Sequence, residues 1–224
     1  MVLRVRDVLA GRRDFSADSE RVPWPRILAL VVLAGIVHGA AMGSLGMRPR
    51  LIAYGAIKLP ILMIGATFLC LPNLWVVCAV LGVRAKFAGT VRGILCAQAT
   101  LAITAASLAP VVAFVGLCGA SYPFALLANA VVLALAAVAG QRSLRRHATP
   151  LVERAPRVRV VLLAWFVLHA FTSTKLAWIL RPFVGDPELP AEFVRAERWS
   201  DDPFANLFWT AVALAASIAR RFVD

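Results

Sequence analysis

The chain has 224 residues, of which 61% are hydrophobic and 16% are charged, and its formal net charge is +12. Soluble domains carry about 25% charged and 45–50% apolar residues, so this composition excludes an ordinary soluble globular protein. In a membrane protein, an excess of lysine and arginine reports topology and attraction to anionic lipids, which argues against nucleic acid as a partner. The four cysteines form no CxxC pair and lie in or beside apolar runs, as small buried hydrophobic residues do.

Residues 1–26 are predicted to form a basic amphipathic segment on the membrane surface. Apolar residues recur there at helical spacing among arginines: Val2, Val5, Val8 and Leu9. This charged leader is too long and too acidic for the n-region of a cleavable signal peptide. We therefore expect the apolar run that follows it to be a retained membrane anchor.

Apolar runs predict six transmembrane helices within residues 27–222. Runs that approach or exceed 18 apolar residues are long enough to cross the hydrocarbon core as helices. The predicted helices cover residues 27–46, 51–82, 93–117, 123–140, 161–180 and 204–219. The predicted fold class is therefore all-α, a polytopic membrane helix bundle with an interfacial segment at its N-terminus.

The first predicted helix carries glycines at every fourth position: Gly35, Gly39 and Gly43. They share one face, and small residues on one face let the backbone of another helix approach closely. We predict that this face packs against a neighbouring helix.

The second apolar run, residues 51–82, is the longest and is apolar except for Lys58 and Asn73. Pro60 and Pro72 are expected to bend this helix or to release backbone carbonyls at depth, and Asn73 is placed to bond a carbonyl that Pro72 releases. A packing kink is the simpler interpretation of these three residues.

The distribution of basic residues predicts the orientation. With the N-terminus inside, cytoplasmic segments hold 17 of the 24 lysines and arginines and external segments hold 5. If residues 51–82 crossed twice, the arginine-rich stretch 141–160 would lie outside. We therefore predict a multi-pass protein of the bacterial inner membrane (the plasma membrane), with both termini cytoplasmic and the acidic loop 186–202 external.

Catalytic signatures are absent from the sequence. No aspartate or glutamate falls within a predicted helix, although ion-coupled carriers commonly place a carboxylate at membrane depth. HExxH, P-loop and GxGxxG motifs are also missing. We predict no catalytic residue, no metal site, no cofactor and no enzymatic activity; Ser44 with His169 supports only a minor alternative, an intramembrane enzyme. We expect His38 and His169 to hydrogen-bond across helices and not to ligate a metal.

Lys58 and Lys175 are the strongest functional candidates, because a lysine in hydrocarbon costs on the order of 3 kcal/mol unless it snorkels or faces a polar cavity. Both fall in the outer half of the predicted membrane domain. Either each snorkels to outer headgroups, or the second and fifth predicted helices meet at similar depth and form a cationic outer pocket for an anion or a lipid phosphate. The candidate ligand-binding residues are Lys58, Lys175, Arg181, Arg50, His169, Thr172 and Ser173.

Five strings resemble an uncharacterised family of bacterial polytopic membrane proteins, remotely Yip1-like: VLAGRRDF, GAAMGSLG, KLPILMIGATFLCLPNLWVVCAVLG, ASLAPVVAF and WILRPFVGDP. The resemblance covers most of the chain and implies location and architecture only. The Yip1-like family is described with five spans and with acidic motifs that this chain lacks.

Three function classes stay open. The first is an accessory or scaffold subunit of a membrane complex, with a membrane protein partner or a second copy of the chain. The second is a channel or transporter for an anion or an anionic lipid, which would use the cationic outer pocket. The third is the intramembrane enzyme. In each class we expect anionic lipids at the cytoplasmic face.

Overall fold

The computed structural model describes residues 24–44, 47–119 and 121–181, together with Phe183 and Phe193. Every regular element in these ranges is helical, which confirms the all-α prediction for this part of the chain. Most of the predicted N-terminal segment, residues 1–23, and the sixth predicted helix, residues 204–219, lie outside the described residues.

The helices are mostly long. Their bounds are Trp24–Met42 for α2, Pro49–Val80 for α3, Arg84–Lys86 for the short 3-10 helix η3, Phe87–Ser107 for α4, Ala109–Leu117 for α5, Tyr122–Arg154 for α6 and Val158–Leu180 for α7. Five stretches are long and apolar enough to cross a membrane, with η3, α4 and α5 forming one of them. Six crossings were predicted, and the sixth falls outside the described residues.

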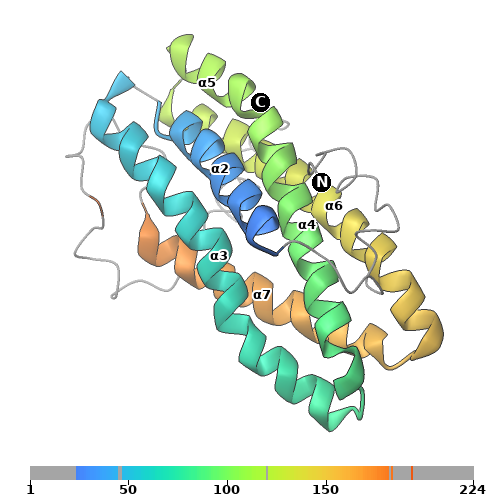
Figure 1. The fold of residues 1–224 in the computed structure, drawn as a ribbon. Helices are drawn as coiled ribbons and strands as arrows, with labels where there is room; N and C mark the ends of the chain where they lie inside the picture. The colour runs from blue at the N-terminus through green and yellow to red at the C-terminus, as the bar shows by residue number, and fades with distance from the viewer. Residues whose placement is uncertain (1–23, 45–46, 120, 182, 184–192, 194–224) are drawn as a thin grey trace, which may run out of the picture.

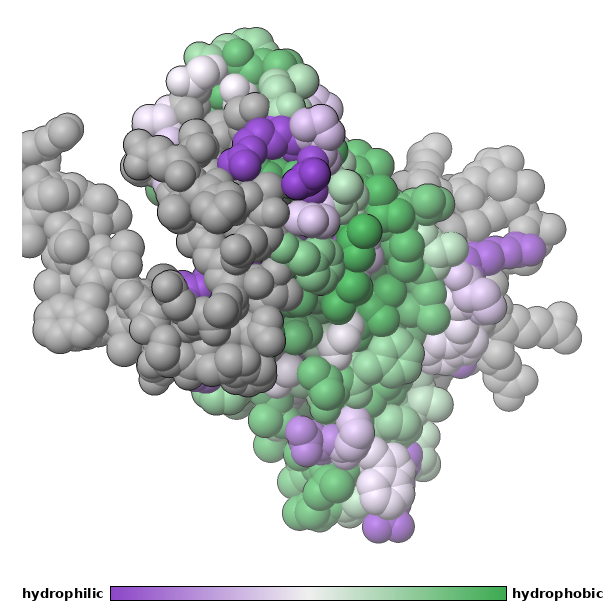
Figure 2. All heavy atoms as spheres, turned by 90° about the vertical axis from the view of Figure 1, so that its left-hand side faces the viewer, coloured by the Kyte–Doolittle hydropathy of each residue, from purple (hydrophilic) through white to green (hydrophobic). Residues whose placement is uncertain are grey.

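The bundle is built around α2, which lies between α3 and α4 (Figure 1). α6 packs along α4, and α7 packs on α3. Figure 2 shows one face of the molecule, where hydrophobic side chains form a broad band and hydrophilic ones gather in separate patches towards its margins. Such a band is what a membrane-spanning bundle presents to lipid.

The glycines of α2 lie against the backbone of α3. A Cβ added at Gly39 would collide with the carbonyl group of Gly55, whose carbon would lie only 2.7 Å away, and a Cβ at Gly55 would collide with the carbonyl of Gly39. At Gly43 the Cβ would collide with the backbone of Leu51. The two helices therefore approach backbone to backbone, which only small residues permit.

α3 continues through both of its prolines. The ring of Pro60 lies against α2, where a Cβ added at Gly35 would come within 3.1 Å of Cγ. Pro72 and Asn73 are exposed on the surface of the helix. Pro60 therefore takes part in the α2–α3 contact, whereas Pro72 lies outside the core.

Several predicted boundaries were wrong. α2 spans Trp24–Met42 and not 27–46, and α4 begins at Phe87 and not at residue 93. α6 runs to Arg154 and not to residue 140, so most of the predicted 141–160 loop is helical; buried Leu144, Ala148 and Leu151 hold this extension to the bundle. The predicted helix 93–117 is interrupted at Leu108, because Pro110 cannot donate the next backbone hydrogen bond.

One end of the bundle collects basic residues, and we call it the basic end. The α3–α4 and α6–α7 connections both lie there (Figure 1), and Arg157 Nη1 donates to the Leu81 carbonyl oxygen at 3.5 Å between them. Arg92 also lies over the ring of Trp24, so α2 begins at the same end. The basic residues of this end are Arg26, Arg84, Lys86, Arg92, Arg142, Arg145, Arg146, Arg154, Arg157 and Arg159.

Candidate functional site

A cavity of about 280 Å³ lies among α3, α4, α6 and α7. α7 packs closely on α3 but makes few contacts with α6, and the cavity occupies the space between these two helices. Exposed lining residues on both helices, Ala137 on α6 and Ala170 on α7, mark its opening toward the surroundings.

The lining of the cavity is mostly aliphatic and aromatic. Leucine, alanine, isoleucine, methionine, phenylalanine and tryptophan side chains form most of it, and its polar side chains are Gln98, Gln141, His169 and Ser173. On α6 the lining extends from Leu133 to Leu144, roughly 17 Å at 1.5 Å per residue. This length is close to half of the ~30 Å hydrocarbon core, which is the depth that one acyl chain occupies.

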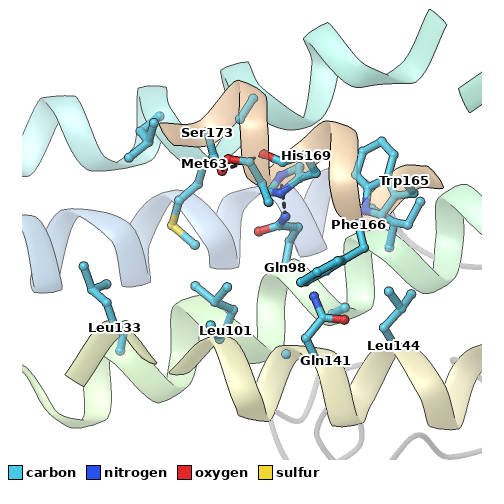
Figure 3. Close-up of a pocket in the computed structure, with 18 of the residues that line it drawn as sticks. Met63, Gln98, Leu101, Leu133, Gln141, Leu144, Trp165, Phe166, His169 and Ser173 are labelled. Carbon is cyan, nitrogen blue, oxygen red and sulfur yellow. Dashed lines mark hydrogen bonds between the residues drawn. The ribbon is translucent and has the colours of Figure 1, made fainter. Parts of the chain in front are cut away.

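A hydrogen bond between α4 and α7 forms the polar part of the cavity (Figure 3). The amide nitrogen of Gln98 lies 3.0 Å from Nε2 of His169 and donates to it, which leaves the ring proton on Nδ1. The tilted ring of Trp165 packs beside that of His169, with 5.2 Å between centroids. Ser173 donates to the His169 carbonyl at 2.6 Å, so its hydroxyl is satisfied within α7. Gln141 points toward the cavity from α6.

Two of the seven predicted ligand-binding residues, His169 and Ser173, line this cavity. The other five are not part of its lining: Lys58, Lys175, Arg181, Arg50 and Thr172. Arg50 is exposed in the first turn of α3, at the end of the bundle opposite the basic end, and Thr172 is half-buried on α7. His169 and Ser173 therefore contribute polar groups to a cavity that is largely apolar.

Lys58 is fully buried in α3. Its ammonium lies 5.8 Å from the ring centroid of Tyr54 and 5.0 Å from that of Phe193, and these two rings meet edge to face. Attraction between a cation and aromatic faces is stronger where water is excluded. The ammonium therefore lies beside two aromatic rings in the interior of the bundle.

α3 and α7 are neighbours, as the hypothesis of a cationic outer pocket requires. The way in which the two helices are aligned nevertheless places Lys58 and Lys175 at different levels. A Cβ on Gly65 of α3 would lie 3.4 Å from Leu176 of α7. Lys175 is next to Leu176, so it lies near the level of Gly65, seven residues from Lys58 and roughly 10 Å along the helix axis. Further along α7, the guanidinium of Arg181 stacks on Trp178 at 3.8 Å. The cations are spread along the interface.

The second predicted histidine has different surroundings from His169. His38 is fully buried on α2, where it faces the backbone of Ala105 and the side chain of Asn129. Both groups lie close enough to interact with the ring as hydrogen-bond partners, although neither ring nitrogen nor Oδ1 of buried Asn129 makes a hydrogen bond of strict geometry. The expected hydrogen bond across helices is therefore well formed at His169, whereas at His38 its partners on α4 and α6 are in place at looser geometry.

A serine and a histidine also meet at the α4–α6 interface. The hydroxyl groups of Thr100 and Ser143 lie 3.0 Å apart, and His147 Nδ1 lies 3.4 Å from Ser143 Oγ. Nδ1 also lies 2.8 Å from the Ser143 carbonyl oxygen and donates to it, so this nitrogen has no free lone pair to accept a proton. Ser143 and His147 are each only 4% exposed. The group therefore joins two helices and does not form a nucleophile–base pair.

Sequence analysis missed three amide residues that lie in the interior or in the cavity: Gln98, Asn129 and Gln141. An amide inside an apolar run was the available signal. Among the cysteines, three are buried as predicted, whereas Cys118 is exposed at the end of α5. Within the described residues, no group of three or more histidine, cysteine, aspartate or glutamate side chains could hold a metal ion.

Ser44, the predicted partner of His169 in the enzyme alternative, donates its hydroxyl to the Ala41 carbonyl at 2.7 Å in the turn after α2. His169 is paired with Gln98 instead.

Comparisons with protein-family models, with curated proteins and with solved structures find no match for this chain. The resemblance to Yip1-like bacterial membrane proteins therefore stays a prediction. The helices support a more general statement: five stretches have the length and composition of membrane-spanning helices, as in an integral membrane protein.

Proposed function

We propose that this integral membrane protein binds one membrane lipid, whose acyl chain occupies the cavity among α3, α4, α6 and α7. The observation that carries the proposal is the cavity itself, about 280 Å³ of largely apolar space open between α6 and α7. Ligand sites commonly occupy about 300–1,000 Å³ and combine an apolar lining with a few placed polar groups. A cavity that opens toward hydrocarbon meets lipid before any water-soluble ligand.

The match in length supports a chain-like occupant. The lining of α6 extends over roughly 17 Å, and an acyl chain of one leaflet spans about half of a 30 Å core. The Gln98–His169 pair supplies a polar point within this length, at which an ester or hydroxyl group of a lipid could exchange hydrogen bonds. This proposal replaces the hypothesis of a cationic outer pocket. It keeps His169 and Ser173 from the predicted ligand-binding residues and does not use Lys58 or Lys175.

Photo-crosslinking tests the proposal. A phospholipid with a photoreactive acyl chain, added to the purified protein in mild detergent, should react with lining residues of α6 and α7. Replacing Ala137 and Ala170 by phenylalanine should fill the opening and remove these crosslinks, because both alanines line the cavity and are exposed. Ala134→Phe is the matched control, since Ala134 is an exposed residue of α6 outside the lining. Crosslinks scattered equally over all lipid-facing helices would contradict the proposal.

The extension of α6 favours a second candidate, the accessory or scaffold subunit expected from the sequence. Residues 141–154 continue the helix by about 20 Å past the predicted span and carry four arginines. We propose the cytoplasmic side for this extension on the positive-inside rule, in the bacterial inner membrane as predicted. The glycine face of α2 adds nothing to this candidate, because α3 already occupies it. Co-purification of a stoichiometric acidic partner that is lost on deleting residues 142–154 would favour the second candidate.

A further inference from the structure

Two exposed arginines extend the cavity-lining faces of α6 and α7 toward the basic end. Arg145 follows the lining residue Gln141 by four positions, and Arg159 precedes the lining residue Phe166 by seven. Residues four or seven apart share one face of a helix. Arg145 thus lies one residue past Leu144, the last lining residue of α6, and Arg159 lies six residues, almost two turns, before Trp165, the first lining residue of α7.

Among the residues that the structure describes, cations far outnumber carboxylates at this end. The basic end holds ten lysines and arginines, and Glu153 is the one carboxylate among all the residues that the structure describes. Glu153 lies two turns past Arg145 on α6, beyond the cavity. An anion brought to Arg145 and Arg159 would meet attraction from several cations.

An apolar lining alone does not select a lipid. Hydrocarbon chains in the bilayer are as apolar as leucine side chains, so moving an acyl chain from the bilayer into the cavity brings no hydrophobic gain. Selectivity must come from groups that the bilayer interior does not offer. Guanidinium groups at the mouth of the cavity supply them, because arginine binds phosphate through paired N–H donors as well as by charge.

We propose that the cavity selects an anionic phospholipid, with one acyl chain between α6 and α7 and the phosphate-bearing headgroup held by Arg145 and Arg159. This inference rests on the proposed function and assigns to it a ligand class and a headgroup site. It places the anion at the basic end of the bundle, opposite the end at which the sequence predicted a cationic pocket.

Native mass spectrometry of the full chain in mild detergent tests the headgroup site. Phosphatidylglycerol and phosphatidylcholine with identical acyl chains are titrated separately, and inorganic phosphate is added as a competitor. The double variant Arg145→Gln/Arg159→Gln should bind phosphatidylglycerol about 30-fold more weakly than the wild type, roughly fivefold for each arginine. Phosphatidylcholine binding should change much less.

The control variant is Arg142→Gln/Arg146→Gln. It removes the same amount of charge from the basic end, but these exposed arginines of α6 point away from the lining face. It should weaken phosphatidylglycerol binding threefold or less. Equal losses in the two double variants would show general surface attraction and would overturn the headgroup site. Displacement of lipid by millimolar inorganic phosphate would also overturn it, since the site would then be one for a free anion.

The outcomes separate this inference from the function on which it rests. If the Arg145→Gln/Arg159→Gln variant binds both lipids like the wild type, while filling the opening at Ala137 and Ala170 abolishes binding, the cavity binds lipid and the headgroup site is refuted. If neither set of changes affects lipid binding, the proposed function itself fails.

Discussion

The contact between α2 and α3 makes a sharp prediction for Gly39→Ala. The added Cβ would collide with the carbonyl of Gly55, with its carbon at 2.7 Å, and would lie 3.1 Å from the Cβ of Leu59. Carbon atoms pack best at about 3.5–4.0 Å, so the helices must separate by roughly 1 Å, and a gap of this size removes up to half of each contact energy along the interface. Helix backbones offer no rotamer that could relieve the collision.

Overpacking of this kind typically costs about 1–3 kcal/mol, and we expect Gly39→Ala to lower the free energy of unfolding by about 2 kcal/mol. Gly65→Ala is the matched control, because its Cβ would be in ordinary contact with Leu176 at 3.4 Å. That substitution should be neutral or should stabilise α3 by about 0.5–1 kcal/mol through helix propensity. The free energy of unfolding of both variants can be measured in mixed detergent micelles by raising the fraction of a denaturing detergent. Equal stability of the two variants would refute the backbone-to-backbone packing of α2 on α3.

Three further predictions concern the interior and one turn. A double-mutant cycle with Gln98→Leu and His169→Phe should give a coupling energy of about 0.6–1.7 kcal/mol, as cross-helix hydrogen bonds in membranes do. A coupling energy of zero would show that Gln98 and His169 do not form a stabilising hydrogen bond. His38→Leu combined with Asn129→Leu should leave the free energy of unfolding unchanged or raise it by about 1 kcal/mol, since three buried polar atoms make no hydrogen bond of good geometry there. A clear loss of stability in that double variant would contradict the geometry. A membrane-impermeant maleimide added outside cells should label Cys118 and should not label the three buried cysteines. Labelling of Cys118 only in inverted vesicles would show that the orientation in the membrane is opposite to the predicted one.

Most of the helix pattern could be predicted because long apolar runs leave few alternatives to a membrane helix. The run that became α3 was predicted within two residues at each end, prolines included. The failure at α6 has a physical cause: arginines and polar residues after Gly140 suggested a loop, although Leu, Arg, Gln and Ala all favour helix. The buried positions Leu144 and Leu151, seven apart, were the signal that the helix continued.

The candidate site was less predictable. Lysines within the predicted membrane helices were chosen because their burial is costly, yet the ammonium of Lys58 lies near the ring of Phe193, 135 residues away in the chain. The Gln98–His169 pair joins helices that only the tertiary fold brings together. A cavity arises from how helices cross and separate, and no residue pattern in α6 or α7 specifies the gap between them.

The most direct test of the central claim is the number of tightly bound lipids per protein, measured by native mass spectrometry after mild detergent extraction. The wild type and the Ala134→Phe control should each retain one phospholipid, and the Ala137→Phe/Ala170→Phe variant should retain none while keeping its helical circular dichroism. Retention of the same lipid by the filled variant would contradict the claim that the cavity among α3, α4, α6 and α7 is a lipid site.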